Sequence, residues 1–241
     1  MEKLRNISVC LTPELFSKYS DKESIVVVID ILRATTVISA AFANGVASVI
    51  PVETINEALK FNGKKNYIIA GERDGKKISN FNYSNSPYDY INNDVNKKNL
   101  VLTTTNGTKS IKIAKDHFLI TASYINLDAV IEFLMNQNKD IILLCAGWKG
   151  MFNLEDTIFA GELSDKLLKS GMYKNNCDSL FSSLVLYNKA KNNLYDYLRE
   201  SSHRKRLANL SMNKDVKFCL NPSFKSSIVP ILNKDVIEKN L

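Results

Sequence analysis

The chain has 241 residues, 45% of them hydrophobic, which is enough to fill a sizeable core in one large α/β domain or two small ones. Its formal net charge of +7 comes from 32 Lys and Arg against 25 Asp and Glu, and this excess is spread along the sequence, as on a solvated Lys-rich surface. No apolar run is long enough to span a bilayer, the N-terminus has no signal-peptide core, and the four cysteines form no CxxC pair. These features argue against a membrane protein, a disulfide scaffold and a structural zinc site, so we expect a cytoplasmic protein with reduced cysteines.

A short strand is predicted over residues 7–11, before the most informative stretch of the chain, residues 24–45. That stretch opens with a continuous β-branched run, which is typical of a parallel strand covered on both faces, and it closes with an Ala-rich helix. Four polar side chains lie between the strand and the first turn of the helix: Asp30, Arg33, Thr35 and Thr36. Ligands bind at such strand ends in open α/β sheets, and helix N-termini favour anions. The residues therefore predict an anion site, with Asp30 as a metal ligand or nucleophile, although an ordinary βα connection has the same pattern.

A second strand end carries the same kind of chemistry. Residues 46–52 are predicted as a strand and residues 54–62 as a capped helix, and a buried strand over residues 67–70 then leads to Glu72 and Arg73. A carboxylate and a guanidinium thus again stand just past a strand. Recurrence favours a functional site over a plain connection.

A long polar loop covers residues 75–99, contains Ser86 and is expected to include about one helical turn. The strand predicted over residues 100–103 leads into a second candidate anion site and then into a helix from about residue 109. The members of this site are Thr104, Thr105, Asn106 and Gly107. The segment lacks the glycine and lysine pattern of a P-loop, so ATP is not implied.

Strands are also predicted over residues 118–122 and 141–145, separated by a helix over residues 127–135. Glu155 and Asp156 lie in the first turn of the next helix. Acidic residues there commonly compensate the helix dipole, so these two carboxylates alone do not identify a site.

The last third of the chain is mostly helical. Helices are predicted over residues 178–191, 194–200 and 202–210, and closing strands over residues 216–220 and 228–232. The alternation predicts a single α/β domain over residues 1–241, built as a three-layer α/β/α sandwich with a mostly parallel, mixed sheet and a helical insertion at about residues 172–212.

Several segments together resemble the 2-phosphosulfolactate phosphatase family of the coenzyme M biosynthetic type. The matching segments are Val28–Thr36, Gly71–Arg73, Asn85–Pro87, Leu102–Thr108, Cys145–Gly147, Glu155–Asp156 and Ala160–Gly161, with Ser202–His203 and Asp215–Pro230 at the C-terminal end. The resemblance implies magnesium-dependent hydrolysis of the phosphate ester of a small sulfonated hydroxy acid.

The residue types suit that chemistry, because phosphate-ester hydrolysis needs positive charge on the phosphoryl oxygens and an oriented nucleophile. We expect four carboxylates to bind Mg²⁺: Asp30, Glu72, Glu155 and Asp156. Arg33, Thr35 and Thr36 would bind one anionic end of the substrate. The other end would contact Arg73, Ser86, Thr104, Thr105, Asn106 and Gly107. Asp30, Arg33, Glu72 and Arg73 are the expected catalytic residues.

The nucleophile is either metal-activated water, which we favour, or Asp30. None of the four cysteines has the spacing to arginine of a cysteine phosphatase, and Leu32 stands where a haloacid dehalogenase phosphatase carries a second Asp. His117 and His203 are expected to be structural or surface residues.

The expected partner is a small anionic phosphoester, with no membrane and no nucleic acid, and the sequence is compatible with a homodimer. Two other classes of function remain open. One is an anion-binding protein without turnover, and the other is a nucleic-acid-associated protein that uses the basic cluster at residues 203–206, around Arg204.

Overall fold

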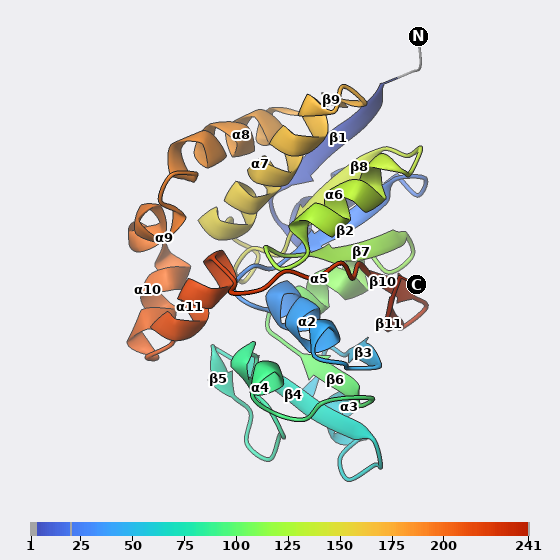
Figure 1. Cartoon of the computed structure of the whole chain (residues 1–241), viewed down its shortest axis with the longest axis vertical. Coiled ribbons are helices and arrows are strands. Elements are labelled where there is room, and N and C mark those ends of the chain that lie inside the picture. Colours follow the sequence, from blue (N-terminus) through green and yellow to red (C-terminus); the bar gives the residue numbers. More distant parts are fainter. Residues whose placement is uncertain (1–3, 20, 241) are drawn as a thin grey trace.

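The computed structural model describes residues 4–19 and 21–240, and in this part of the chain strands alternate with helices until the helical C-terminal third (Figure 1). The strands are β1 (Arg5–Cys10), β2 (Ile25–Ile29), β3 (Ser48–Pro51), β4 (Tyr67–Arg73), β5 (Lys76–Lys77), β6 (Asn99–Thr103), β7 (Phe118–Ala122), β8 (Ile141–Cys145), β9 (Tyr173–Asn175), β10 (Pro230–Asn233) and β11 (Val236–Lys239). The helices are α1 (Phe16–Tyr19), α2 (Ala34–Ala43), α3 (Ile55–Leu59), α4 (Tyr88–Ile91), α5 (Gly107–Ile113), α6 (Leu127–Met135), α7 (Leu154–Lys169), α8 (Asp178–Ala190), α9 (Leu194–Tyr197), α10 (Ser202–Asn209) and α11 (Asn213–Leu220), with 3₁₀ turns η1 (Pro13–Leu15) and η2 (Leu198–Glu200).

One mixed sheet contains all the strands, in the order β5-β4-β6-β3-β11-β10-β7-β2-β8-β1-β9. Its pairs are parallel within two groups, β4-β6-β3 and β7-β2-β8-β1-β9. The antiparallel hairpin β10-β11 joins the groups through one residue pair on each side, Ile231 with Ile120 and Ile237 with Val49. The predicted α/β class and the mostly parallel, mixed sheet are confirmed.

Helices pack on both faces of β2, because its two faces are equally apolar. Ile25, Val27 and Ile29 belong to a core shared with α6, α7 and α8, whereas Val26 and Val28 belong to a core shared with α2 and α5. The second core also contains Leu100 and Leu102 of β6, so α2 and α5 lie between the two groups of parallel strands. Both helices begin next to the carboxyl end of a strand, and this is where the sequence predicts the site.

The predicted helices of the last third are confirmed as α8, α9 with η2, and α10. The predicted strand over residues 216–220 is wrong, because this segment is part of α11. Val216, Cys219 and Leu220 are buried at i, i+3 and i+4, which is the spacing of one helix face. Three short strands, β5, β9 and β11, were not predicted; they have two to four residues and mixed polarity.

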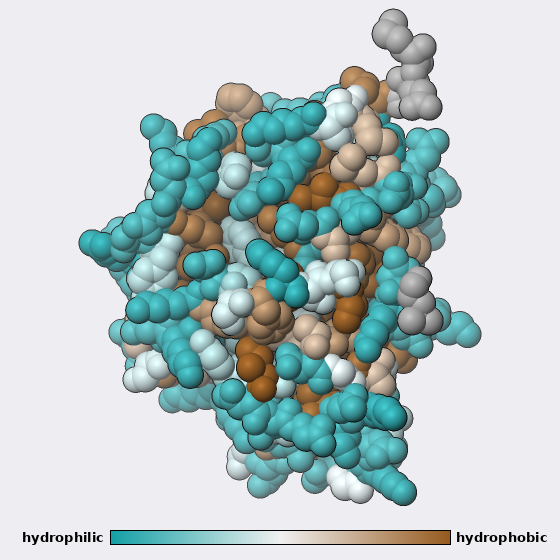
Figure 2. All heavy atoms as spheres, in the orientation of Figure 1, coloured by the Kyte–Doolittle hydropathy of each residue, from teal (hydrophilic) through white to brown (hydrophobic). Residues whose placement is uncertain are grey.

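The surface of the face in Figure 2 is covered mostly by hydrophilic side chains, with apolar atoms in small patches. Across residues 4–19 and 21–240, no helix combines the length and the hydropathy needed to cross a membrane.

Candidate active site

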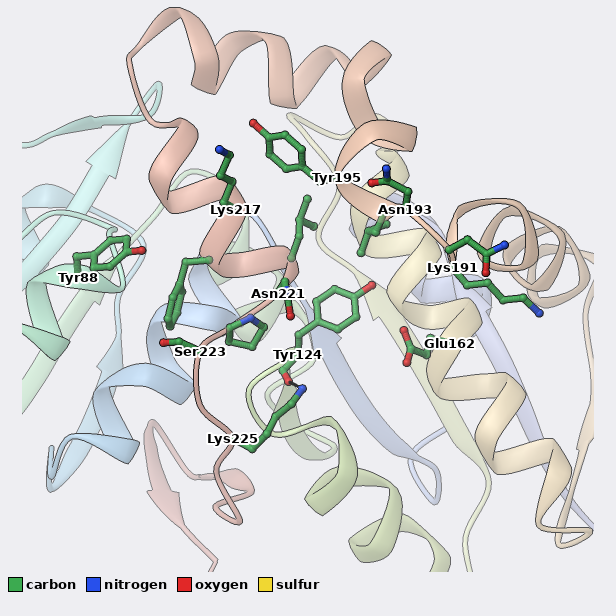
Figure 3. A pocket seen from close by; sticks show the side chains of 15 residues that line it. Tyr88, Tyr124, Glu162, Lys191, Asn193, Tyr195, Lys217, Asn221, Ser223 and Lys225 are labelled. Carbon is green, nitrogen blue, oxygen red and sulfur yellow. Dashed lines mark hydrogen bonds between the residues drawn. The ribbon is translucent and has the colours of Figure 1, made fainter.

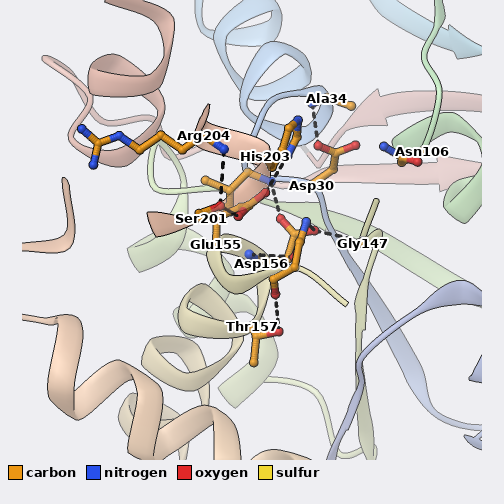
Figure 4. Close-up of polar contacts among 12 residues, drawn as sticks. Asp30, Ala34, Asn106, Gly147, Glu155, Asp156, Thr157, Ser201, His203 and Arg204 are labelled. Atoms are coloured by element: carbon orange, nitrogen blue, oxygen red, sulfur yellow. Dashed lines mark hydrogen bonds and ion pairs between the residues drawn. The ribbon is translucent and has the colours of Figure 1, made fainter. Parts of the chain in front are cut away.

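Asp30 lies at the carboxyl end of β2 and touches the first turn of α2 (Figure 4). Its Oδ1 accepts a hydrogen bond of 3.2 Å from the Ala34 backbone N–H, so the carboxylate meets the positive end of the helix dipole. The residue is only 7% exposed. The pKa of Asp30 is raised to about 6, mainly by burial and also by nearby Glu72 and Glu155, although His203 and the hydrogen bond from Ala34 lower it. Its pKa thus lies within reach of neutral pH, which is typical of functional carboxyl groups.

Gly107, the first residue of α5, packs directly against this carboxylate. A Cβ at position 107 would lie 2.6 Å from Asp30 Oδ2 and 2.4 Å from the Ala34 Cβ, both closer than real Cβ contacts. Only glycine therefore lets α5 and α2 bring their N-termini together around Asp30.

Glu72, on β4, connects the two loops that flank it. Its Oε1 accepts from the Thr105 N–H and its Oε2 from the Gly75 N–H, each at 2.7 Å. Its carboxylate is 6% exposed and contributes negative potential at Asp30. The carboxyl ends of β2, β4 and β6 therefore lie together.

Asp156 forms hydrogen bonds with the segments that follow β2 and β8. One oxygen accepts from the Ile31 N–H at 2.8 Å, and the other accepts from the Gly147 N–H at 3.2 Å and from Asn153 Nδ2 at 2.8 Å. Burial raises the pKa of Asp156 well above its usual range, and the nearby Asp30 and Glu155 carboxylates raise it as well. This carboxylate holds the strand ends in place, and both of its oxygens accept hydrogen bonds from protein donors.

Glu155 is completely buried and pairs with a histidine that the sequence analysis assigned to a structural or surface role. Glu155 Oε1 lies 2.6 Å from His203 Nδ1, and Glu155 Oε2 accepts from the Ser201 hydroxyl at 3.3 Å. The His203 ring is tilted against Trp148, with ring centroids 5.0 Å apart. Figure 4 shows His203 beside Asp30, with Asn106 on the other side of that carboxylate. The only sequence signal was the Ser202–His203 pair within the resemblance.

Arg33 lies in the turn after Asp30 and is held by the C-terminal third of the chain. Its guanidinium donates to Asp215 Oδ2 and, at 3.2 Å, to the Gly75 carbonyl. Ser86 donates to the other oxygen of Asp215 at 3.1 Å. A buried carboxylate on α11 therefore orients two of the predicted substrate-binding residues, and it was missed because residues 216–220 were read as a strand.

Three of the four predicted threonine hydroxyls are bonded to the backbone, whereas the Thr105 hydroxyl is buried and has no hydrogen-bond partner among the described residues. Thr35 donates to the Asp30 carbonyl and Thr36 to the Ile31 carbonyl, both at 2.9 Å. The Thr104 hydroxyl accepts from the Thr108 N–H at 3.1 Å. These hydroxyls shape the turns around the site, and their contact with a substrate stays a prediction.

Arg73 and Asn106 have different positions. Arg73 donates to the Glu72 and Glu53 carbonyls and to the Thr103 hydroxyl, all within 2.8 Å, and so connects neighbouring strand ends. Asn106 accepts from the Lys149 N–H at 2.9 Å and lines the cavity beside Asp30.

That cavity, which we call the catalytic cavity, has a volume of about 20 Å³. It is lined by Asp30, Leu32, Arg33, Glu72, Gly75, Asn85, Asn106, Trp148, His203 and Leu207. The Asn85 Oδ1 atom is buried and has no hydrogen-bond partner. In the described part of the chain, no three His, Cys, Asp or Glu side chains are grouped as a ready-made metal centre. Asp30 and Glu72 therefore meet here as a pair of carboxylates beside an unpaired amide oxygen.

The basic cluster at residues 203–206 does not form one exposed surface. His203 faces the catalytic cavity, the Arg204 guanidinium stacks 3.7 Å over Tyr195, and Arg206 stacks 3.6 Å over Trp148. Lys205 is exposed and paired with Glu200. This arrangement does not support the nucleic-acid interpretation, which needs a continuous basic surface.

Comparison with known proteins agrees with the geometry. Residues 10–235 match the family model described as 2-phosphosulpholactate phosphatase. A protein of Caldanaerobacter subterraneus subsp. tengcongensis is 37% identical, over 94% of this chain and 96% of its own length, and one of Clostridium tetani is 37% identical over 97% and 100%. One of Thermotoga petrophila is 39% identical over 86% and 88%, and all three are named probable 2-phosphosulfolactate phosphatase. The chain therefore belongs to the 2-phosphosulfolactate phosphatase family, whose members are phosphoric monoester hydrolases.

Proposed function

We propose that this protein is a magnesium-dependent phosphatase that hydrolyses the phosphate ester of a small anionic hydroxy acid, with 2-phosphosulfolactate as the first candidate and sulfolactate and phosphate as the products. The observation that carries the proposal is the grouping of Asp30, Glu72, Arg33 and the Glu155–His203 pair around one cavity. Each is a group that phosphate-ester hydrolysis requires.

The oxygen atoms at this cavity fit Mg²⁺. The ion takes one or two carboxylates and keeps several waters, and Asp30 with Glu72 supplies two carboxylates. Each Glu72 oxygen accepts one backbone N–H and has a further lone pair, and within the described residues no donor is bonded to Asp30 Oδ2. The unpaired Asn85 Oδ1 is a third oxygen of the right kind. When bound, Mg²⁺ would stabilise negative charge that develops on the phosphoryl oxygens.

The other two predicted metal ligands fit supporting roles. The protein donors around Asp156 keep β2 and β8 in register, and Glu155 orients His203. A carboxylate that fixes a histidine in one tautomer also stabilises its protonated form. We therefore assign Glu155 and Asp156 to positioning.

The remaining groups divide the reaction between them. Arg33 is held by Asp215 at the cavity and binds the phosphoryl oxygens. His203 uses the nitrogen that does not face Glu155 to give a proton to the ester oxygen as its bond to phosphorus breaks, and water adds to the phosphorus. The nucleophile is either that water, which would attack phosphorus directly, or Asp30, which would form a covalent phosphoryl intermediate that the water then hydrolyses. The sequence leaves both possibilities open.

Substrate binding requires the site to open. A volume of about 20 Å³ holds roughly one water, which is less than a phosphoester needs. The wall formed by Trp148, His203 and Leu207 includes two residues of α10, so we expect α10 to move. Arg206 on the same helix has buried Nε and Nη2 atoms without partners, and it is our candidate for the second acidic group of the substrate.

The test is phosphate release from a panel of esters, with and without a chelator. We expect 2-phosphosulfolactate and phosphorylated hydroxy acids to have higher kcat/KM than phenyl phosphate, which has no second acidic group. Activity should disappear with chelator and return with added Mg²⁺. A chelator-resistant enzyme would contradict the metal role, equal kcat/KM across the panel would contradict the second anion contact, and absence of release from every ester would favour the anion-binding alternative.

A further inference from the structure

A second, larger cavity lies behind α11, away from the catalytic cavity (Figure 3). Its volume is about 740 Å³, within the usual range for small-molecule sites. Its labelled side chains come from α4, α7, α9, α11 and the connecting segments: Tyr88, Tyr124, Glu162, Lys191, Asn193, Tyr195, Lys217, Asn221, Ser223 and Lys225. The two cavities share no lining residue. We call this one the α11 cavity.

The α11 cavity contains a polar group that the protein does not satisfy. Tyr124 is 6% exposed, and its ring packs edge-on against Phe159 with centroids 4.9 Å apart, so the side chain is fixed. Its hydroxyl is buried without a hydrogen-bond partner. Figure 3 shows that hydroxyl pointing into the space between Asn193 and Glu162. Because burial without a partner costs stability, such a hydroxyl suggests a ligand that supplies one.

Positive charge around the cavity is also left uncompensated. Lys191, Lys217 and Lys225 line it, and none of them forms an ion pair within the described residues. Lys225 instead donates to the Tyr124 carbonyl at 2.8 Å. Lys191 donates to Asn188 Oδ1 at 2.9 Å and points away from the other lining side chains in Figure 3, so Lys217 is the lining ammonium group that has no hydrogen bond within the described residues, and it favours an anionic ligand.

The positions of these groups indicate the rest of the ligand. Figure 3 shows Lys217 on the α11 side of the cavity and Glu162 on the opposite, α7 side. Glu162 would repel an anionic group but accept hydrogen bonds from hydroxyls, and Tyr124 and Asn193 beside it can also pair with hydroxyls. We propose that the α11 cavity binds a small hydroxylated anion, with its acidic group toward Lys217 and its hydroxyls toward Tyr124 and Glu162.

The test is titration calorimetry of the full-length protein in a chelator-containing buffer. The probes are ribose 5-phosphate and gluconate, which distinguish a phosphate from a carboxylate source, with neutral ribose as the comparison. At least one anion should bind and ribose should not. Lys217→Met should weaken binding about 10-fold or more, as expected for loss of one hydrogen bond to a charged group, and Tyr124→Phe should weaken it roughly 5-fold, as expected for loss of one hydrogen bond between neutral groups. Tyr197→Phe and Lys189→Met, outside the cavity, should bind normally.

Three outcomes would overturn the proposal. The first is no binding of either anion up to about 10 mM, a range in which even weak millimolar sites are visible. The second is unchanged affinity in both Tyr124→Phe and Lys217→Met. The third is a marked change of affinity, in either direction, in Asp30→Asn, which would place the anion in the catalytic cavity. Tyr124→Phe removes only the unpaired hydroxyl, so its Tm without ligand should equal or exceed that of the wild type, and this shows that any loss of affinity is not a folding defect.

Discussion

Replacing Asp30 by Asn should inactivate the protein and at the same time stabilise it. The carboxyl group has a pKa of about 6 in the folded chain against an ordinary value of 3.8. That difference corresponds to roughly 3 kcal/mol of unfolding free energy lost when the group ionises. Asn keeps the oxygen that accepts from the Ala34 N–H but never carries the charge. The rate should fall at least ~10²-fold, because an electrostatic group that acts in the transition state is removed.

The pH dependence of the stability difference between wild type and variant tests the direction of this effect. Below about pH 4 the wild-type carboxyl is protonated in both the folded and the unfolded chain, so wild type and variant should have equal stability. Between about pH 4 and 6 the unfolded chain ionises first and the wild type loses stability, and above about pH 6 the variant should keep its full advantage. Urea unfolding from pH 4 to 8, with chelator present so that no cation pairs with Asp30, measures this difference. A variant that is less stable at pH 7, or one whose advantage does not change with pH, would refute the reasoning.

Three further substitutions test other parts of the site. His203→Gln should lower kcat about 10²-fold for an alkyl phosphate ester and much less for p-nitrophenyl phosphate, whose leaving group needs no proton; equal losses would contradict the proton-donor role. Asp215→Asn leaves Arg33 buried without its carboxylate, so unfolding free energy should fall by about 3 kcal/mol or more and kcat/KM should fall with it, and a neutral outcome in both measurements would show that this pair does not organise the site. Gly107→Ala places a Cβ against Asp30 and should cost about 1–3 kcal/mol in urea unfolding together with most of the activity; normal activity would show that α5 can move away at no cost.

Each of these substitutions has a matched control elsewhere in the chain. His117→Gln changes the other histidine, which packs edge-on against Phe16, and should leave the leaving-group dependence unchanged. Asp74→Asn breaks the exposed pair with Lys149 and should hardly alter stability. Gly63→Ala meets no neighbouring atom within 4 Å, so it should cost about 1 kcal/mol for its positive φ alone and leave activity intact.

The elements that were predicted correctly are those in which one local signal dominates. β2 is apolar on both faces and stops at a carboxylate, so the run of residues and its end are both visible in the sequence. The helix α3, which follows Thr54, has a complete capping box: the Thr54 hydroxyl accepts from the Glu57 backbone N–H, and the Glu57 carboxylate accepts from the Thr54 backbone N–H. α11 was misread because residues 216–220, a short segment with four apolar residues around Lys217, fit a strand as well as a helix. Its helical state depends on packing against segments that are distant in the sequence.

The site residues also divide into those with a clear local signal in the sequence and those without one. Asp30, Arg33, Glu72 and Asn106 could be found because each lies at or just after the carboxyl end of a strand, and the carboxyl ends of parallel strands lie together. His203 could not be found in this way, since it lies in a run of basic residues and its meaning comes from Glu155, which is 48 positions earlier. Nor does the sequence distinguish carboxylates that face a cavity from those bonded to backbone N–H groups, as Asp156 is.

The pairing of Arg33 with Asp215 joins residues that are 182 positions apart. During synthesis on a ribosome, β2 and α2 emerge long before the segment that contains Asp215, and for that interval the arginine has no carboxylate partner. His203 likewise reaches Glu155 only when α10 has been made. Nascent chains that stop before α10 therefore contain Asp30 and Glu72 but neither an oriented arginine nor a proton donor. In the mechanism proposed above, turnover would therefore require that nearly the whole chain has been translated and that the C-terminal helices have docked.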